Sequence, residues 1–393
     1  MRKRNLILLT IICILSITAL TGLLVIAFDQ QKIRNKDMAE SVEPTLTPTP
    51  LPNNEPTTPV PSPTSSPTPT EIALRNEPII LGFAGDVNLD EDSYPVAKYA
   101  EEGKGILGVL SKDLVEEMNS ADIMMLNNEF AYSTRGVEET DKSYTFRANP
   151  SSVVILNEMG VDIVSLANNH ALDFGPDALL DTFSTLDTAG ITYVGAGENM
   201  ARAKLPIYYN IGDKIIAFVA ASRVVFAMDW YATDTTPGMI GTYDPTLFME
   251  SIKEAKENAD FVVAYVHWGV ERNNYPENYQ KVFAQNYIDA GADAVIGCHP
   301  HVMQGLTFYK GKPIAYSLGN FWFNKSTKES GMVKLYLEPD DTIRVQLLPV
   351  MNKDTKTYIL TKEKERSAYF DYMEGISFDV KIDDNGFVTE ADK

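Results

Sequence analysis

From residue 78 onward, short apolar runs alternate with segments in which apolar residues recur every three or four positions. The runs are rich in β-branched residues and predict strands, whereas the periodic segments predict helices. The predicted strands span residues 78–89, 121–130, 161–166, 191–197, 214–222, 261–269, 292–301 and 313–321. The predicted helices span residues 105–119, 176–189, 245–258 and 276–290. Residues 332–337 and 342–349 suggest a closing hairpin, and the alternation as a whole predicts an α/β layered fold.

The run at residues 161–166 shows a feature that recurs in other predicted strands. Three consecutive polar residues, Asn168, Asn169 and His170, follow it closely, and Asp173 comes within reach of His170. Polar side chains in this position would lie at the carboxyl edge of a sheet, where open α/β folds bind their ligands. The pattern therefore predicts a binding or catalytic site at that edge.

The chain begins differently. Residues 1–5 contain the cluster Arg2-Lys3-Arg4, and residues 6–28 contain no charged side chain. A helix of that length, at about 1.5 Å per residue, would cross the hydrocarbon core of roughly 30 Å. We predict an uncleaved transmembrane signal anchor, with residues 1–5 in the cytoplasm and the rest of the chain outside the cell. A cleaved signal peptide is the alternative, but its apolar core would be shorter and a small-residue cleavage site would follow it.

Residues 29–76 have the composition of a linker. Between residues 41 and 70, proline alternates with serine and threonine, a pattern that buries too little apolar surface to fold and favours an extended chain. We predict a disordered stalk that lifts a domain away from the membrane. That domain would span residues 77–350, and residues 351–393 would be a C-terminal extension packed on it or trailing from it.

Composition narrows the choice of partners. The formal net charge of −20 argues against a nucleic-acid partner, which needs a basic surface. Of the two cysteines, Cys13 lies in the N-terminal apolar run, so Cys13 and Cys298 do not form a disulfide framework.

The four histidines of the chain carry the strongest chemical signal. His170, His267, His299 and His301 each follow a short apolar run closely, with Gly, Pro or Asn within two residues. A single histidine of this kind is more often a hydrogen-bonded structural residue. Four of them at equivalent strand ends, together with carboxylates, favour a metal site. Imidazole and oxygen ligands suit Mn, Fe, Zn or Mg, which the sequence does not distinguish. The oxygen ligands expected with these histidines are Asp86, Glu129 and Asn169.

Six motifs follow one another along the chain. They are Gly85-Asp86, Asn127-Asn128-Glu129, Ala167-Asn168-Asn169-His170 with Asp173, His267-Trp268-Gly269 with Glu271, Gly291-Ala292-Asp293 with Gly297-Cys298-His299-Pro300-His301, and Ser317-Leu318-Gly319-Asn320-Phe321. This ordered set closely resembles that of the CapA family of capsule (poly-γ-glutamate) synthesis proteins, which look like members of the calcineurin-like metallophosphoesterase superfamily. The resemblance covers most of residues 78–350, and a membrane anchor is also typical of the family.

The resemblance implies a four-layer α-β-β-α sandwich of the metallophosphatase type with two divalent metal ions. Asp86 and His301 would bind the first ion, and Glu129 would bridge the two. The second ion would be bound by Asn169, His267 and His299. Asn88 stands where phosphoesterases of the superfamily have a histidine and would be a weaker metal ligand.

The catalytic residues that the resemblance implies are His170 and Asp173. His170 would contact a phosphate or protonate the leaving oxygen. Asp173 would orient His170 through its other ring nitrogen, or it would complement the start of the next helix with negative charge.

The functional expectation is a membrane-anchored, extracellular CapA-like protein of capsule biosynthesis or export with a phosphoesterase-like site of two metal ions. The partners expected are poly-γ-glutamate or a phosphoester substrate, and membrane subunits of a capsule synthase. Two alternatives stay open. The protein could bind and export polymer without catalysis, or it could be a metal-dependent hydrolase of another cell-envelope substrate.

Overall fold

The structure, a computed structural model, describes residues 75–391. The predicted anchor and all but the last residues of the predicted stalk lie outside the described residues. Within residues 75–391, no helix is both long enough and apolar enough to cross a membrane.

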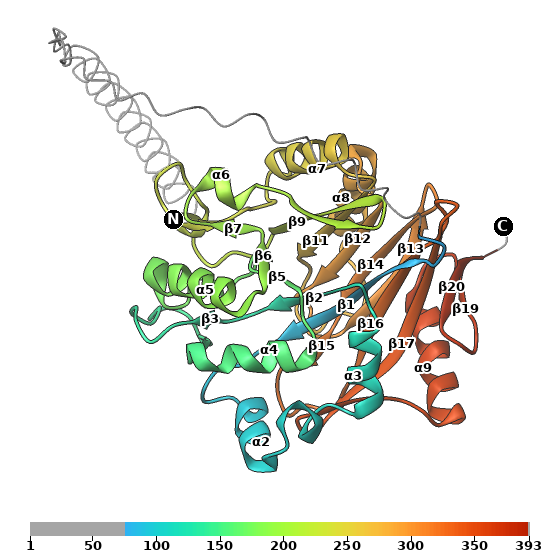
Figure 1. The fold of residues 1–393 in the computed structure, drawn as a ribbon, viewed down its shortest axis with the longest axis horizontal. Coiled ribbons are helices and arrows are strands. Elements are labelled where there is room, and N and C mark those ends of the chain that lie inside the picture. Colours follow the sequence, from blue (N-terminus) through green and yellow to red (C-terminus); the bar gives the residue numbers. More distant parts are fainter. Residues whose placement is uncertain (1–74, 392–393) are drawn as a thin grey trace, which may run out of the picture. The chain divides into compact units, whose positions relative to one another are not determined.

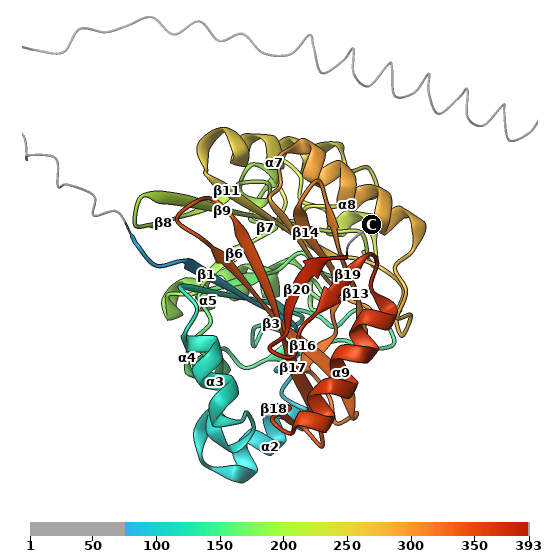
Figure 2. The ribbon, with the colours of Figure 1, turned by 90° about the vertical axis from the view of Figure 1, so that its right-hand side faces the viewer.

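Two large sheets form the centre of the fold (Figures 1 and 2). The ten-stranded sheet has the order β19-β20-β17-β16-β1-β2-β5-β6, and β15 and β18 pair with β1 and β17. Its strands are β1 (Ile79–Val87), β2 (Ile123–Asn128), β5 (Ile163–Ser165), β6 (Thr192–Val194), β15 (Asn320–Trp322), β16 (Lys328–Leu337), β17 (Ile343–Lys353), β18 (Lys356–Ile359), β19 (Val380–Ile382) and β20 (Phe387–Glu390).

The six-stranded sheet has the order β13-β14-β12-β11-β9-β8. Its strands are β8 (Ile207–Ile211), β9 (Lys214–Ser222), β11 (Phe261–His267), β12 (Ala294–Cys298), β13 (Met303–Tyr309) and β14 (Lys312–Leu318). Short strand pairs are made by β3 (Ala131–Tyr132) with β4 (Arg147–Ala148), and by β7 (Ala196–Gly197) with β10 (Gly238–Met239).

The strands that carry the predicted motifs run parallel within each sheet. In the ten-stranded sheet, β1, β2, β5 and β6 pair in parallel, and so do β9, β11, β12 and β14 in the six-stranded sheet. Their carboxyl ends therefore meet at one edge of each sheet. This edge is where the sequence places the polar residues.

The two sheets pack face to face through one apolar core. Phe83 of β1 and Phe218 of β9 have ring centroids 6.5 Å apart, and the Tyr265 hydroxyl of β11 donates to the Ala84 carbonyl at 2.9 Å. A second core, which includes Trp268, lies between the six-stranded sheet and helices α7 (Thr246–Asn258) and α8 (Asn278–Ala290).

Helices α7 and α8 thus cover the outer face of the six-stranded sheet, and α4 and α5 lie on the other side of the molecule against the ten-stranded sheet (Figures 1 and 2). The helices are α2 (Tyr94–Glu102), α3 (Lys112–Asn119), α4 (Val153–Met159), α5 (Gly175–Ala189), α6 (Met200–Ala203), α7 (Thr246–Asn258), α8 (Asn278–Ala290) and α9 (Glu363–Ile376), with 3-10 turns η1 (Gly105–Gly108), η2 (Pro150–Ser152) and η3 (Met228–Trp230). The result is a mixed α/β fold built on several sheets.

A close approach between strands explains one glycine of the predicted motifs. A Cβ atom on Gly85 would lie 1.9 Å from the Gly319 carbonyl oxygen, so no other residue fits without a shift of the backbone. This approach allows the Asp86 N–H to donate to the same carbonyl at 2.9 Å. Gly85 therefore helps to fix Asp86 at the carboxyl edge of β1.

Four expectations from the sequence differ from the structure. The strand predicted over residues 191–197 is divided into β6 and β7 at Gly195, which has a φ of +85°. The helix predicted over residues 105–119 is divided into η1 and α3, because the Ser111 N–H donates to the Thr357 carbonyl and holds the chain extended between them. The strand predicted over residues 313–321 is divided into β14 and β15 at Gly319, which has a φ of +66°.

The fourth difference is the C-terminal boundary. Residue 350 lies inside β17, and β18 and β20 pair with that strand. The Tyr369 hydroxyl of α9 donates to the Ser330 carbonyl at 2.6 Å. Residues 351–391 are therefore part of the same sheet and core.

Candidate metal centre

The predicted site residues come from the facing edges of both sheets. Asp86 lies in β1, Glu129 follows β2, and Asn169 and His170 lie in the turn after β5. From the six-stranded sheet, His267 ends β11, and His299 and His301 follow β12. The fold thus brings together residues that lie more than a hundred positions apart in the sequence.

Glu129 lies at the centre of this group. Its carboxyl oxygen Oε1 is 3.9 Å from Nε2 of His170, 3.9 Å from Nε2 of His267 and 3.7 Å from Nε2 of His301. The side chain is fully buried, and Oε1 has no hydrogen-bond partner within the described residues. With metal–ligand bonds of about 2.0–2.2 Å, two atoms on one ion lie about 3–4 Å apart. The distances from Glu129 Oε1 to the imidazole nitrogens are therefore those expected for atoms that bind the same metal ion.

His299 is the second buried group without a partner. Its Nδ1 makes no hydrogen bond to any residue that the structure describes, and its ring centroid lies 4.6 Å from that of His267. Burial, with the nearby His301, lowers the pKa of His299 to about 3, so the imidazole is neutral and offers a lone pair. Its φ of +100° is rare for a residue other than glycine and is typical of functional sites. These features fit a divalent metal ligand.

Asp86 is buried and pairs with the partly buried His301. His301 Nδ1 lies 3.3 Å from Asp86 Oδ2 and 2.7 Å from the Asn320 amide oxygen. Burial raises the pKa of Asp86, but the hydrogen bonds and charge from His301 and Asn127 outweigh this and hold it below its ordinary value. Burial lowers the pKa of His301, but Asp86 and Asn320 raise it overall.

Glu129 differs from Asp86, because burial and then the charge of Asp86 raise the pKa of Glu129 well above its ordinary value. The donor set and the buried atoms without partners both fit bound divalent ions.

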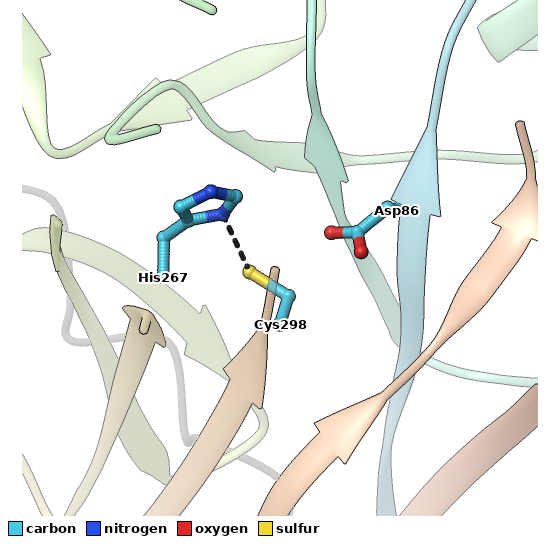
Figure 3. A group of neighbouring side chains, drawn as sticks. All are labelled: Asp86, His267 and Cys298. Carbon is cyan, nitrogen blue, oxygen red and sulfur yellow. Dashed lines mark hydrogen bonds between the residues drawn. The ribbon is translucent and has the colours of Figure 1, made fainter. Parts of the chain in front are cut away.

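His267 connects the two sheets, because its Nε2 lies 2.6 Å from Asn169 Oδ1 in the turn after β5. Its Nδ1 lies 3.3 Å from the Cys298 sulfur of the neighbouring strand β12 (Figure 3). Asp86, His267 and Cys298 each present a possible ligand atom within 4.8 Å of one another. Burial raises the pKa of the Cys298 thiol well above its ordinary value, so the thiol is protonated and acts as a weak hydrogen-bond partner of His267.

His170 is oriented by Asp173. Asp173 Oδ2 lies 2.7 Å from His170 Nδ1 and accepts a second hydrogen bond from the Phe146 N–H at 2.7 Å. The Phe146 ring packs 4.2 Å from the imidazole. Asp173 precedes α5, whose first-turn acidic residue is Asp177. Of the two roles that the sequence left open for Asp173, the geometry therefore favours the orientation of His170.

Asn88 is placed differently from the other predicted ligands. The side-chain amide oxygen of Asn88 accepts from the Asp90 N–H at 2.8 Å, and the backbone N–H of Asn88 donates to the Trp322 carbonyl. Among residues 75–391, no hydrogen bond joins its side chain to the histidines or to Glu129. The structure thus gives Asn88 a role in the turn after β1, and its role as a metal ligand stays a prediction.

Sequence reasoning missed several residues that hold the site. The Asn127 amide donates to Asp86 at 2.8 Å and to Glu129 at 3.2 Å, and the Asn168 amide donates to Asn127 at 3.0 Å. Lys142, from the segment before β4, contacts Asp173 and the turn after β5. The two asparagines are in the quoted motifs and could have been found as strand-end amides, whereas no pattern marks Lys142.

The chain is similar in sequence to curated proteins of capsule synthesis. It is 31% identical over 263 residues to the PGA biosynthesis protein CapA of Bacillus subtilis (strain 168), and the alignment covers 66% of this chain and 69% of that protein. It is 34% identical over 223 residues to the capsule biosynthesis protein CapA of Bacillus anthracis, which covers 55% of this chain and about half, 54%, of that protein.

Among solved structures, a phosphatase of Mycoplasma pneumoniae aligns at 12% identity with a TM-score of 0.46, over 71% of this chain and 96% of that one. The NAD nucleotidase of Haemophilus influenzae aligns at 10% identity with a TM-score of 0.42, over 77% of this chain and 63% of that one. The family model described as bacterial capsule synthesis protein PGA_cap matches residues 80–325, which is more than half of the chain. The chain therefore belongs to this family of bacterial capsule synthesis proteins.

Proposed function

We propose that this protein is a metal-dependent hydrolase of capsule polymer metabolism, with two divalent ions in a site of the metallophosphatase type. The observation that carries the proposal is the position of Glu129 Oε1, 3.7–3.9 Å from three imidazole nitrogens and without another partner among the described residues. The arrangement of helices, two facing sheets and helices is also that expected for the α-β-β-α sandwich. The substrates we propose are poly-γ-glutamate or a phosphoester.

The residues that would hold the ions are those at the two sheet edges. Asp86 and His301 would hold one ion, and His301 Nδ1 lies 3.3 Å from Asp86 Oδ2. Asn169, His267 and His299 would hold the other, and His267 Nε2 lies 2.6 Å from Asn169 Oδ1. When bound, two divalent ions supply Lewis-acid activation of an ester or amide and charge stabilisation in its transition state. Glu129 would serve both ions, because its Oε1 lies 3.9 Å from His267 Nε2 and 3.7 Å from His301 Nε2.

His170 is the residue that would move a proton. Its Nδ1 donates to Asp173, so its Nε2 faces Glu129 Oε1 at 3.9 Å and is free to accept or return a proton there. Phe146 packs against the His170 ring, and Phe323 packs 4.6 Å from the His301 ring. The two phenylalanines limit the access of water to one wall of the site. A site that only binds polymer has no need of an oriented imidazole beside the metal ligands, and this favours catalysis.

The test uses the full chain, purified in detergent and loaded with Mn²⁺. A phosphomonoester, a phosphodiester and poly-γ-glutamate would be offered, and product release would be compared with that of His170→Ala. We expect His170→Ala to lower turnover by about 10²–10⁴-fold, the usual contribution of general acid–base catalysis. Asp177→Asn, in the first turn of α5, is the control and should keep full activity. Full metal content without turnover of any substrate would favour the alternative of polymer binding.

We further propose that residues 6–28 anchor the chain in the cell membrane as a single span, with the domain outside the cell and with membrane subunits of a capsule synthase as partners. The uncharged run and the preceding Arg2-Lys3-Arg4 cluster support this. Protease added to intact cells should cleave the domain from the cell surface. A domain that resists protease until the cells are broken would contradict the proposed orientation.

A further inference from the structure

Lys142 is a largely buried cation beside the candidate metal centre, and no motif of the sequence assigns it a role. Its side chain is 9% exposed and lies in the segment that leads into β4. The ammonium contacts the main-chain oxygen of Asn169 and Oδ1 of Asp173, and Nζ lies 3.0 Å from His170 Nδ1. One side chain therefore contacts three residues of the turn that follows β5.

The hydrogen bonds of Asp173 decide which nitrogen of His170 carries the proton. Asp173 Oδ2 lies 2.7 Å from His170 Nδ1, and a carboxylate only accepts. His170 Nδ1 is therefore the donor, and Nε2 faces Glu129. Because a ring N–H cannot also accept, the Lys142 ammonium does not donate to Nδ1. It donates to Asn169 and Asp173 instead.

Aromatic rings occupy the remaining side of Lys142. Its Nζ lies 5.1 Å from the Trp230 ring centroid and 6.0 Å from that of Phe226, and the negative face of an aromatic ring attracts an ammonium group. The Lys142 ammonium thus contacts oxygen atoms of Asn169 and Asp173 and lies near the two aromatic rings, all within the protein. This arrangement differs from that of a surface lysine that awaits an anionic ligand, and it points to a role in holding the site together.

The charge of Lys142 explains how Asp173 can be buried. Asp173 is fully buried, and a buried carboxylate is strongly destabilised unless a cation and hydrogen bonds compensate it. The Lys142 ammonium supplies the cation, and the His170 Nδ1–H and the Phe146 N–H supply two hydrogen bonds. With Lys142 removed, the turn would have to rearrange around an uncompensated charge.

We propose that Lys142 is a positioning residue of the metal centre, which fixes the turn after β5 so that Asn169 Oδ1 faces His267 and His170 Nε2 faces Glu129. The inference rests on the proposed function in one respect, because it takes the Asn169 amide as a ligand of an ion. Its other part, the orientation of His170, concerns the metal-free protein.

The test compares Lys142→Met with Lys334→Met in the full chain. Lys334 is a matched control, because it is also a buried lysine, 4% exposed, in an ion pair with Glu117, and it lies in β16. Histidine-selective NMR of the metal-free protein reports four imidazoles, one of which is His170. In the wild type and in Lys334→Met we expect His170 to show one tautomer, with a slowly exchanging Nδ1 proton. In Lys142→Met we expect that proton to exchange rapidly and the single tautomer to be lost.

The second measurement is a titration with Mn²⁺ alone. Partners that orient metal ligands typically contribute 10–100-fold to affinity, so we expect a loss of about that size in Lys142→Met and none in Lys334→Met. If Lys142→Met does not fold, Lys142→Arg replaces it. The charge is then kept, but a planar guanidinium cannot take the place of the ammonium between Asn169 and Asp173, and we expect weaker Mn²⁺ binding with the tautomer retained.

A wild-type His170 spectrum together with wild-type Mn²⁺ affinity in Lys142→Met would overturn the proposal. Wild-type Mn²⁺ affinity in Lys142→Arg, where that variant is needed, would do the same. The outcome is separate from that of the proposed function. A wild-type protein that turns over no ester or polymer would refute the proposed function, yet the imidazole spectrum and the Mn²⁺ titration would still decide the role of Lys142.

Discussion

His267 Nε2 and Asn169 Oδ1 lie 2.6 Å apart, although 98 positions separate the two residues in the sequence. Asn169 follows β5 of the ten-stranded sheet, and His267 ends β11 of the six-stranded sheet. The contact shows that the candidate metal centre is shared between the two sheets. Its geometry therefore depends on how the sheets pack.

This shared position makes His267 the residue whose loss should affect one ion most directly. We expect His267→Ala to lower bound Mn²⁺ by one equivalent per chain, because an ion held by three or four ligands rarely tolerates the loss of an imidazole. Elemental analysis of the purified protein measures this. Val266→Ala is the control, since Val266 is buried in the core on the other face of the same strand. Equal metal content in His267→Ala and the wild type would show that His267 is not a ligand.

Cys298 should act through His267. The Cys298 sulfur lies 3.3 Å from His267 Nδ1, the nitrogen that points away from Asn169. Removal of a group that orients a metal-binding histidine typically weakens metal affinity by 10–100-fold, and a thiol is a weak partner, so we expect about tenfold in Cys298→Ala. Cys298→Ser keeps a hydrogen-bonding atom and should stay close to the wild type. The measurement is a calorimetric Mn²⁺ titration. Equal losses in both variants would mean that the size of the sulfur matters and its hydrogen bond does not.

Sequence reasoning reached these residues because their pattern is local. Each histidine follows an apolar run, so the strand and its polar end can be recognised together, and parallel strands bring such ends to one edge. Lys142 has no such signal. It lies in an irregular segment before β4, and its partners are set by tertiary packing alone. The C-terminal residues also lack a local signal, since β20 is recognised by its pairing with β17.

The pH dependence of metal binding follows from two raised pKa values. Burial and then Asp86 raise the pKa of Glu129 well above its ordinary value. For His301, burial acts in the opposite direction, but Asp86 and Asn320 raise the pKa overall. In the metal-free protein, both groups stabilise the fold below their unfolded pKa values, and this stability is lost as the pH rises through the folded values.

Divalent ions compete with those protons. The stabilisation of the fold by bound metal should therefore increase as the pH rises, whereas the stabilisation by the protonated groups decreases. We expect the affinity for Mn²⁺ to rise with pH between 6 and 8, by up to about tenfold per unit for each proton displaced. The increase in unfolding temperature on addition of Mn²⁺ should grow over the same range. Calorimetry in buffers of different ionisation enthalpy should show proton release. Metal stabilisation that declines from pH 6 to pH 8 would be incompatible with this account.

Gly85 tests whether the edge of β1 sets the site. A Cβ atom there would meet the Gly319 carbonyl oxygen at 1.9 Å, and because that atom is backbone, β1 and β15 would have to separate. Overpacking of this kind typically costs 1–3 kcal/mol and occasionally more, so we expect Gly85→Ala to lower the free energy of unfolding by about 3 kcal/mol. Since Asp86 is the next residue, Mn²⁺ affinity should fall as well.

Gly375→Ala is the control, because Gly375 lies in α9 with no atom within 4 Å of an added Cβ. Alanine in place of glycine in a helix should raise the free energy of unfolding by about 0.5–1 kcal/mol. Chemical denaturation and a Mn²⁺ titration measure both effects, and a Gly85→Ala protein with wild-type Mn²⁺ affinity would show that Asp86 does not depend on this approach of the strands.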